Sequence, residues 1–101
     1  MITAKEIKGF LAKSKGLINK PKPDNIFFKT RWGIHTFGLK FPIDVIITDK
    51  NNKVVALRKN LKPNNIFIWN PRYENVLELK PQTIKINNIK INSKLKLNIK
   101  I

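Results

Sequence analysis

The sequence contains no cysteine and a single histidine among its 101 residues. Disulfides, thiolate metal ligands and thiol nucleophiles are therefore excluded, and one histidine cannot supply the nitrogen and sulfur ligands of a usual zinc site within one chain. No apolar run approaches the roughly 20 residues that span a bilayer, and Met1 to Glu6 contains no hydrophobic segment of the signal-peptide type. We therefore expect a cytoplasmic protein with no transmembrane segment, no metal site and no cofactor.

Acidic residues are also scarce, because six Asp and Glu stand against 21 Lys and Arg, giving a net charge of +15. A field of this size attracts nucleic acid, anionic membranes or acidic proteins. Lys, Asn and Ile dominate the composition, as AT-rich coding favours, so the lysines could instead form a solvated surface. AT-rich coding would also supply glutamate, however, and the composition leaves both interpretations open.

Helical signals are confined to the start of the chain. Thr3–Glu6 fits a capping box, and Ile7, Phe10 and Leu11 fall on one helical face. Gly16 is suited to the C-terminal cap. The sequence predicts a short N-terminal helix.

Strand signals follow at intervals of about ten residues, as in β-sandwiches and β-barrels. The strongest is a hairpin, in which the turn residues Asp49–Lys53 separate two β-branched runs. The predicted strands are Ile26–Phe28, Val45–Ile47, Val54–Leu57, Ile66–Trp69 and Asn75–Leu79. We predict a mainly β fold, a small β-barrel or sandwich, as a single domain over residues 1–101.

The last segment, Ile84–Ile101, alternates apolar and polar residues almost without interruption. Such alternation predicts a half-buried pair of strands whose lysines protect exposed sheet edges. A basic stripe along a phosphate backbone is the alternative, but no aromatic residue is interleaved for base stacking. We favour the structural interpretation.

Three stretches carry a resemblance to a known family: Ala12 with Gly16–Ile18, then Ile34–Ile46, and finally Val76–Leu79. The central stretch, Ile-His-Thr-Phe-Gly leading into Phe-Pro-Ile-Asp, is the most specific. Together they resemble domain of unknown function 192, also called uncharacterised protein family 0127, from about Ala12 onward.

The resemblance implies a compact β-barrel or sandwich with one or two short helices, and it brings no established catalytic residue or substrate. It also implies a helical turn near Thr83–Asn88, where alternation predicts strand. The chain departs from the family pattern at Lys80–Gln82, where a glycine is common, and at Asn92–Ser93, where Gly-Asp is usual. Many relatives carry an export signal, which this sequence lacks.

Asp44 is the most unusual candidate, because it is a carboxylate between Ile43 and Val45 in an apolar strand. An unpaired charge there is costly to bury. It could serve as a general base or ligand anchor. Structurally, it could accept hydrogen bonds from the His35–Gly38 loop, or pair with Arg31 or Arg58. We favour the structural role.

His35 and its neighbour Thr36 lie in the family-like stretch, where the histidine could line an aromatic pocket or simply pack. Trp69, Arg72 and Tyr73 form a second group, suited to stacking on a base or sugar, and equally suited to covering one end of the core. No catalytic set is predicted, because the serines have no matched base and no phosphate-binding glycine loop occurs.

Our leading hypothesis is a non-enzymatic binding or accessory module for an anionic ligand, with a pocket between the His35 loop and Trp69–Tyr73. Its ligand-binding residues would be His35, Thr36, Asp44, Trp69, Arg72 and Tyr73. A nucleic-acid-binding protein without sequence specificity is the second hypothesis. An enzyme that uses Asp44 and His35 is the third.

Overall fold

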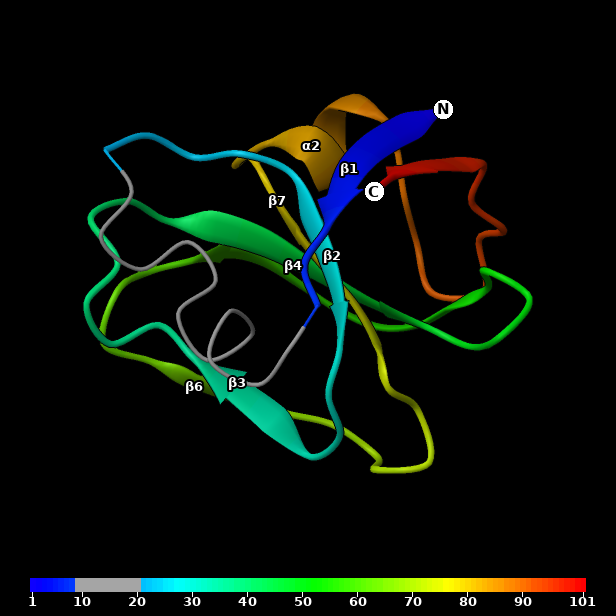
Figure 1. Cartoon of the computed structure of the whole chain (residues 1–101), viewed down its shortest axis with the longest axis horizontal. Helices are drawn as coiled ribbons and strands as arrows, with labels where there is room; N and C mark the ends of the chain where they lie inside the picture. Colours follow the sequence, from blue (N-terminus) through cyan, green and yellow to red (C-terminus); the bar gives the residue numbers. More distant parts are fainter. Residues whose placement is uncertain (9–20) are drawn as a thin grey trace.

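The computed structural model describes residues 1–8 and 21–101, which form two β-sheets (Figure 1). The larger sheet has six strands in the order β5-β4-β7-β2-β1-β8, and the smaller is a two-stranded ribbon, β3-β6. The strands are β1 Ile2–Glu6, β2 Ile26–Lys29, β3 Gly33–His35, β4 Ile43–Thr48, β5 Val54–Leu61, β6 Ile66–Ile68, β7 Asn75–Leu79 and β8 Leu97–Lys100, and α2 spans Thr83–Ile86. The mainly β prediction is confirmed.

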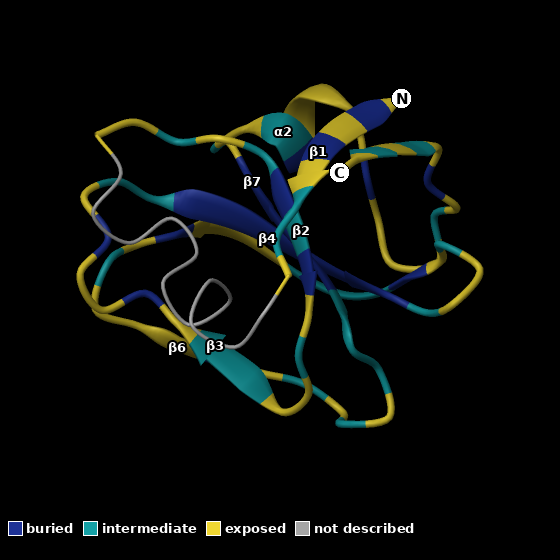
Figure 2. Cartoon of the chain, viewed as in Figure 1, coloured by how far each residue is buried: buried dark blue, intermediate teal, exposed yellow. Residues whose placement is uncertain are grey.

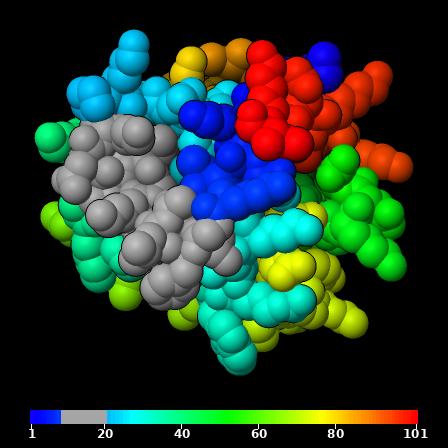
Figure 3. Space-filling view, viewed as in Figure 1, coloured from blue at the N-terminus to red at the C-terminus, as the bar shows by residue number. Residues whose placement is uncertain are grey.

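The six-stranded sheet is open, because its outermost strands β5 and β8 do not pair with each other. The barrel alternative is therefore wrong, and the ribbon packs on one face of the larger sheet. Strands β4, β7 and β2 pair antiparallel, whereas β1 runs parallel to both β2 and β8. Figure 3 shows the start and end of the chain, blue and red, meeting on one face. No helix in the described ranges is long and apolar enough to cross a membrane.

The predicted hairpin is confirmed as β4 and β5, which pair antiparallel across a tight turn. The Asp49 carboxylate closes this turn by accepting hydrogen bonds from the backbone N–H groups of Asn51, at 2.8 Å, and Lys53, at 3.0 Å. Asn52 takes a left-handed conformation, with φ of 64°. Asparagine adopts this region more readily than most residues, so the turn chemistry sets the register of the two strands.

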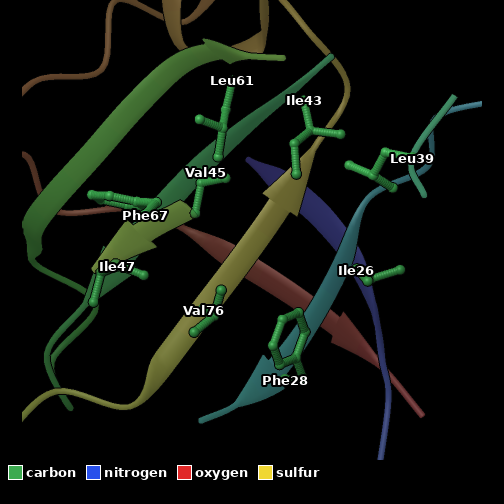
Figure 4. Packing of buried hydrophobic residues seen from close by; sticks show 9 residues of the cluster. All are labelled: Ile26, Phe28, Leu39, Ile43, Val45, Ile47, Leu61, Phe67 and Val76. Carbon is green, nitrogen blue, oxygen red and sulfur yellow. The ribbon is translucent and has the colours of Figure 1, made fainter. Parts of the chain in front are cut away.

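Strand β4 lies inside the sheet and is buried along its whole length (Figure 2). Its alternate residues therefore serve two apolar clusters, one on each face. The cluster facing the ribbon contains Ile26, Phe28, Leu39, Ile43, Val45, Ile47, Leu61, Phe67 and Val76 (Figure 4). The cluster on the opposite face, beneath α2 and the C-terminal segment, contains Ile2, Ala4, Ile46, Val54, Leu77, Leu79, Ile84, Ile89 and Leu95.

The predicted helix start is wrong, because Thr3–Glu6 belongs to strand β1. Ile2 and Ala4 are buried while Thr3 and Lys5 are exposed, an alternation with the period of a strand. Pairing with two neighbouring strands satisfies this backbone and overrides the capping-box signal. The remainder of the predicted helix, Phe10 to Gly16, lies outside the described residues.

The predicted C-terminal strand pair is also wrong over most of its length. Only Leu97–Lys100 forms a strand, whereas Thr83–Ile86 is the short helix α2 and turns follow it. Ile84 and Ile89 are buried, but Ile86 between them is 79% exposed, so the alternation does not match one buried face. Asparagine turns with positive φ break the pattern. The helical turn implied by the family resemblance is confirmed.

The ribbon contains a close backbone approach at Gly33, which pairs with Ile68. A Cβ atom at Gly33 would lie 2.8 Å from the Phe67 carbonyl oxygen and 2.8 Å from Ile68 Cγ2. Such separations are too short for real Cβ contacts, so only glycine fits here. The ribbon's packing therefore depends on the absence of a side chain at this position.

Gly33→Ala should consequently lower the free energy of unfolding by about 1–3 kcal/mol, the usual cost of overpacking. Urea denaturation would measure it. Because the Phe67 oxygen belongs to the backbone, adding Ile68→Ala should recover only part of the loss. An alanine variant as stable as the natural protein would contradict this account of the ribbon.

Candidate functional site

The Asp44 side chain is almost completely buried, with 1% of its surface exposed. Its Oδ1 accepts a hydrogen bond from the Asn60 backbone N–H at 2.9 Å, and its Oδ2 accepts one from the Ile84 N–H at 2.8 Å. Asp44 thus accepts backbone hydrogen bonds, but the predicted donors in the His35–Gly38 loop and the predicted arginine partners were wrong. Its two donors lie 16 and 40 residues away in the sequence.

Opposite Asp44, strand β5 contains a bulge. Ile43 pairs with Leu61 and Val45 with Arg58, so Asp44 alone faces the two residues Lys59 and Asn60. Asn60 has a φ of 51°, in the left-handed region. A bulge leaves one backbone N–H without a partner in the ladder, and Asp44 accepts that hydrogen bond. The carboxylate therefore fixes the path of β5 beyond Arg58.

Thr36 plays a similar part for the turn that follows β5. Its hydroxyl donates to the Lys62 carbonyl oxygen at 2.7 Å and accepts from the Asn65 backbone N–H at 2.9 Å. Its own backbone N–H donates to the Asn65 carbonyl oxygen at 2.9 Å. The fully buried Thr36 thereby holds both ends of the turn from Lys62 to Asn65.

The bulge and this turn together border a basic hollow of about 200 Å³. We use "basic hollow" for the depression lined by Arg58, Lys59, Asn60, Leu61, Lys62 and Asn65. Three of these side chains are cations and none is acidic. The only ion pair within residues 1–8 and 21–101 joins Arg31 to Glu74, so the cations of the hollow form no ion pair with a carboxylate there. The Arg58 guanidinium lies over the Phe67 ring, 5.5 Å from its centroid, which is within the range of a cation–π contact.

His35 lies at the exposed end of β3, where it pairs with Ile66. Its ring stacks on that of Phe37, with centroids 5.0 Å apart and an angle of 22° between planes. The Phe37 backbone N–H donates to His35 Nδ1 at 3.2 Å. His35 therefore belongs to the outer surface of the ribbon, whereas Asp44 bonds to α2 on the far side of the larger sheet. The structure does not bring these two residues together.

The predicted group at Trp69, Arg72 and Tyr73 lies beyond the other end of β6. Trp69 Nε1 donates to the Tyr73 carbonyl oxygen at 2.9 Å, and both rings pack against the ribbon-facing core. The Arg72 guanidinium lies 5.9 Å from the centroid of the Tyr73 ring. Trp69 and Tyr73 therefore cover one end of the core. They lie at the opposite end of the ribbon from His35.

Glu78 is a buried carboxyl group that the sequence interpretation missed. It pairs with Val45 on one side and Ile26 on the other, so its side chain points into the ribbon-facing core. Burial raises the pKa of Glu78 to about 7. The signal was visible in the sequence as a glutamate inside the apolar run Val76–Leu79. The described residues contain no cluster of three or more side chains able to hold a metal ion.

Comparisons with known proteins agree on the fold. The family model for DUF192, described as an uncharacterized ACR, matches residues 4–97. No curated protein matches the chain. A protein of unknown function from Novosphingobium aromaticivorans has a similar structure, with a TM-score of 0.75 and 17% identity over 93% of this chain and 71% of that one. A "putative transcription regulator" from Sinorhizobium meliloti has a TM-score of 0.73 and 18% identity, over 93% and 78%. At these identities the likeness establishes the fold alone.

Asp44→Asn should lower the free energy of unfolding by about 1–3 kcal/mol, the range for losing charge-assisted buried hydrogen bonds. The amide can accept through one oxygen only, and its new NH₂ group would face an N–H donor. The urea midpoint should fall at unchanged slope. Asp24→Asn, at an exposed position, removes the same charge and is the matched control. If Asp44→Asn were at least as stable as the natural protein, Asp44 would be a residue kept for function at a cost to folding.

Glu78 should make stability fall as pH rises from about 4.5 to about 7. The carboxyl titrates near its ordinary value of 4.5 when unfolded and near 7 when folded, so the folded chain binds more protons within that window. The loss amounts to roughly 3 kcal/mol. Glu78→Gln should remove it, leaving the variant more stable than the natural protein at pH 8 and about equal at pH 4.5. Urea midpoints measured across this range would check the effect, and parallel curves for the two proteins would refute it.

Proposed function

The chain belongs to the DUF192 family, whose model covers residues 4–97, and from its own geometry we propose that it is a non-enzymatic binding module for phosphate-class anions held in the basic hollow. The observation that carries the proposal is the convergence of Arg58, Lys59 and Lys62 on one hollow with no acidic residue in its lining. Cations without carboxylate partners are available to an anion from outside.

The chemistry of the lining supports an oxyanion of this kind. A guanidinium offers a planar fork that matches two phosphate oxygens, and ammonium groups add compact point charges. The Asn60 and Asn65 side chains also line the hollow, and an amide NH₂ group can donate to a further oxygen. A depression of about 200 Å³ is of the right order for one or two phosphate groups rather than for a large organic substrate.

The rigidity of the walls supports the proposal further. Asp44 fixes the bulge that carries Lys59, and Thr36 fixes the turn that begins at Lys62. Both are buried polar groups whose hydrogen bonds are made to backbone, so the cations are mounted on a preorganised frame. Preorganisation reduces the ordering cost of binding. Two of the predicted ligand-binding residues are thus assigned a positioning role beneath the ligand.

An enzyme built on Asp44 and His35 is less well supported. Both Asp44 oxygens already accept backbone hydrogen bonds, and the residue is closed off from solvent. His35 lies on the outer surface of the ribbon, on the other side of the larger sheet. A general acid or base must reach the proton that it transfers, and this arrangement gives the pair no shared substrate position.

The variant Arg58→Gln/Lys59→Gln/Lys62→Gln should weaken the binding of inorganic tripolyphosphate at least about tenfold, because it removes three charge-assisted donors. Isothermal titration calorimetry at low salt would measure the affinity. For the natural protein, affinity should fall steeply as salt is raised. Urea denaturation of both proteins would verify that the variant is folded.

The matched control is Lys94→Gln/Lys96→Gln/Lys100→Gln, which changes three exposed lysines on the C-terminal segment. Both triple variants lower the net charge of +15 by three, so the comparison tests where the charge is lost rather than how much. The control should bind tripolyphosphate within about twofold of the natural protein if local contacts dominate. Equal losses in the two variants would assign binding to the overall field and overturn the proposed site.

A further inference from the structure

Four large apolar side chains in and beside the β3–β6 ribbon are exposed. Trp32 is 67% exposed, Phe37 47%, Ile66 60% and Ile68 70%. Ile66 pairs with His35, and Ile68 pairs with Gly33, so the two isoleucines share the ribbon face opposite the buried Phe67. Single exposed apolar residues are ordinary on a protein surface, but several on one small ribbon and its flanking residues are typical of an interaction site. We call Trp32, His35, Phe37, Ile66 and Ile68 the ribbon surface.

Trp32 is held on this surface in a strained conformation. Its φ is 79°, a region that bulky side chains rarely adopt. The Gly33 N–H donates to the Arg31 carbonyl oxygen at 3.0 Å, which closes a γ-turn with Trp32 at its centre. With a positive φ at the central residue, this is the rare, strained form of the turn. The Trp32 carbonyl oxygen accepts from the Trp69 N–H at 3.0 Å. The backbone is thus locked while the indole remains in solvent, and strain of this type clusters at binding sites.

The ribbon surface adjoins the basic hollow. Thr36, which follows His35, bonds to both Lys62 and Asn65 of the hollow, and Asn65 directly precedes Ile66. Arg58 lies on the core-facing side of the same ribbon, with its guanidinium over the ring of Phe67. From Trp32 to His35 the ribbon runs about 10 Å, the length of about three stacked nucleotides.

We propose that the ribbon surface binds a single-stranded nucleic acid, with a backbone phosphate in the basic hollow and bases on Trp32 and the stacked His35–Phe37 pair. This inference rests on the proposed anion-binding function. Proteins that bind single strands without sequence preference combine a cationic track with aromatic platforms, and both lie side by side here. Nucleic acid also complements the charge of +15, whereas a second copy of this chain would be repelled by it.

The test compares a labelled dT12 oligonucleotide, its 12-base-pair duplex and inorganic tripolyphosphate, measured with the natural protein and with Trp32→Gly/Phe37→Ala. The variant keeps every charge. It should bind dT12 at least about 5- to 150-fold more weakly, the effect of losing one stacked base, because it removes Trp32 outright and one ring of the His35–Phe37 pair. Binding of tripolyphosphate and of the duplex should change less than twofold, since neither offers an unstacked base. The dependence of dT12 affinity on salt should keep its slope.

Folding provides a second measurement, because glycine adopts a φ of 79° without strain. Trp32→Gly alone should have an equal or higher urea midpoint while losing affinity for dT12, a combination that a purely structural tryptophan would not give. Quenching of tryptophan fluorescence by dT12 should disappear in this variant, although Trp69 remains. Ile86→Ala, which truncates a 79% exposed residue on α2, is the control for loss of exposed apolar surface and should leave dT12 affinity unchanged.

The outcomes separate the two proposals. If neither tripolyphosphate nor dT12 binds, both are overturned. If both ligands bind in the natural protein but the ring variant keeps its affinity for dT12, the nucleic-acid inference fails and the anion site stands. If the ring variant instead loses binding to poly-glutamate or to vesicles of phosphatidylserine while dT12 is unaffected, the ribbon surface serves an acidic protein or a membrane, and the inference is wrong.

Discussion

The buried carboxylate of Asp44 is the interaction on which much of this fold depends. A charge at the centre of a sheet is tolerated only when hydrogen bonds replace those of water, and each Asp44 oxygen accepts one from a backbone N–H. One donor, Asn60, lies in the bulge of β5, and the other, Ile84, lies in the first turn of α2. That four-residue helix has no side-chain cap of its own, so Asp44 supplies the acceptor that its N-terminus lacks. A single side chain therefore ties the buried strand β4 to the edge strand β5 and to the helix α2.

Glu78 shows the other way in which the same sheet accommodates a carboxyl group. It lies on β7, beside β4, and its neighbours on the ribbon-facing side are Val45 and Ile26. Burial there raises its pKa to about 7, which favours the neutral form. The two acids thus differ in their cost to the fold. Asp44 connects segments of the backbone, whereas Glu78 makes stability sensitive to pH between about 4.5 and about 7.

The elements predicted correctly are those whose signals are local. The β4–β5 hairpin follows from Asp49–Lys53, because the turn residues themselves set the register. Predictions failed where pairing across the fold decided the structure. Thr3–Glu6 is a strand because β2 and β8 flank it, and Ile84–Ile101 leaves the strand pattern because turns with positive φ bring only some of its apolar residues to the core.

The site could be predicted only in part, for the same reason. The sequence identified Asp44 as an acid needing partners, and it singled out His35 and Thr36, but it could not show which backbone they would meet. The partners of Asp44 lie 16 and 40 residues away, and those of Thr36 lie 26 and 29 residues away. The basic hollow exists only because these contacts place a bulge beside a turn. Lys59 and Lys62 therefore looked like any other cations in a chain with 21 of them, and Arg58 was considered only as a partner of Asp44.

The location of the hollow bears on whether its charges are functional or protective. Strand β5 is an edge strand, and lysines and bulges on edges prevent pairing with other chains. Its first residue is already covered, because Val54 exchanges backbone hydrogen bonds with Asn92 and Ser93. Its second half is open and carries the bulge and the cations, so edge protection explains their presence. It does not require three cations to converge on one hollow, nor a strained, exposed Trp32 on the adjoining ribbon. The same edge can therefore be protected from pairing and also bind a ligand. Edge protection does not explain why Trp32 is held in a strained backbone conformation while its side chain is exposed to solvent.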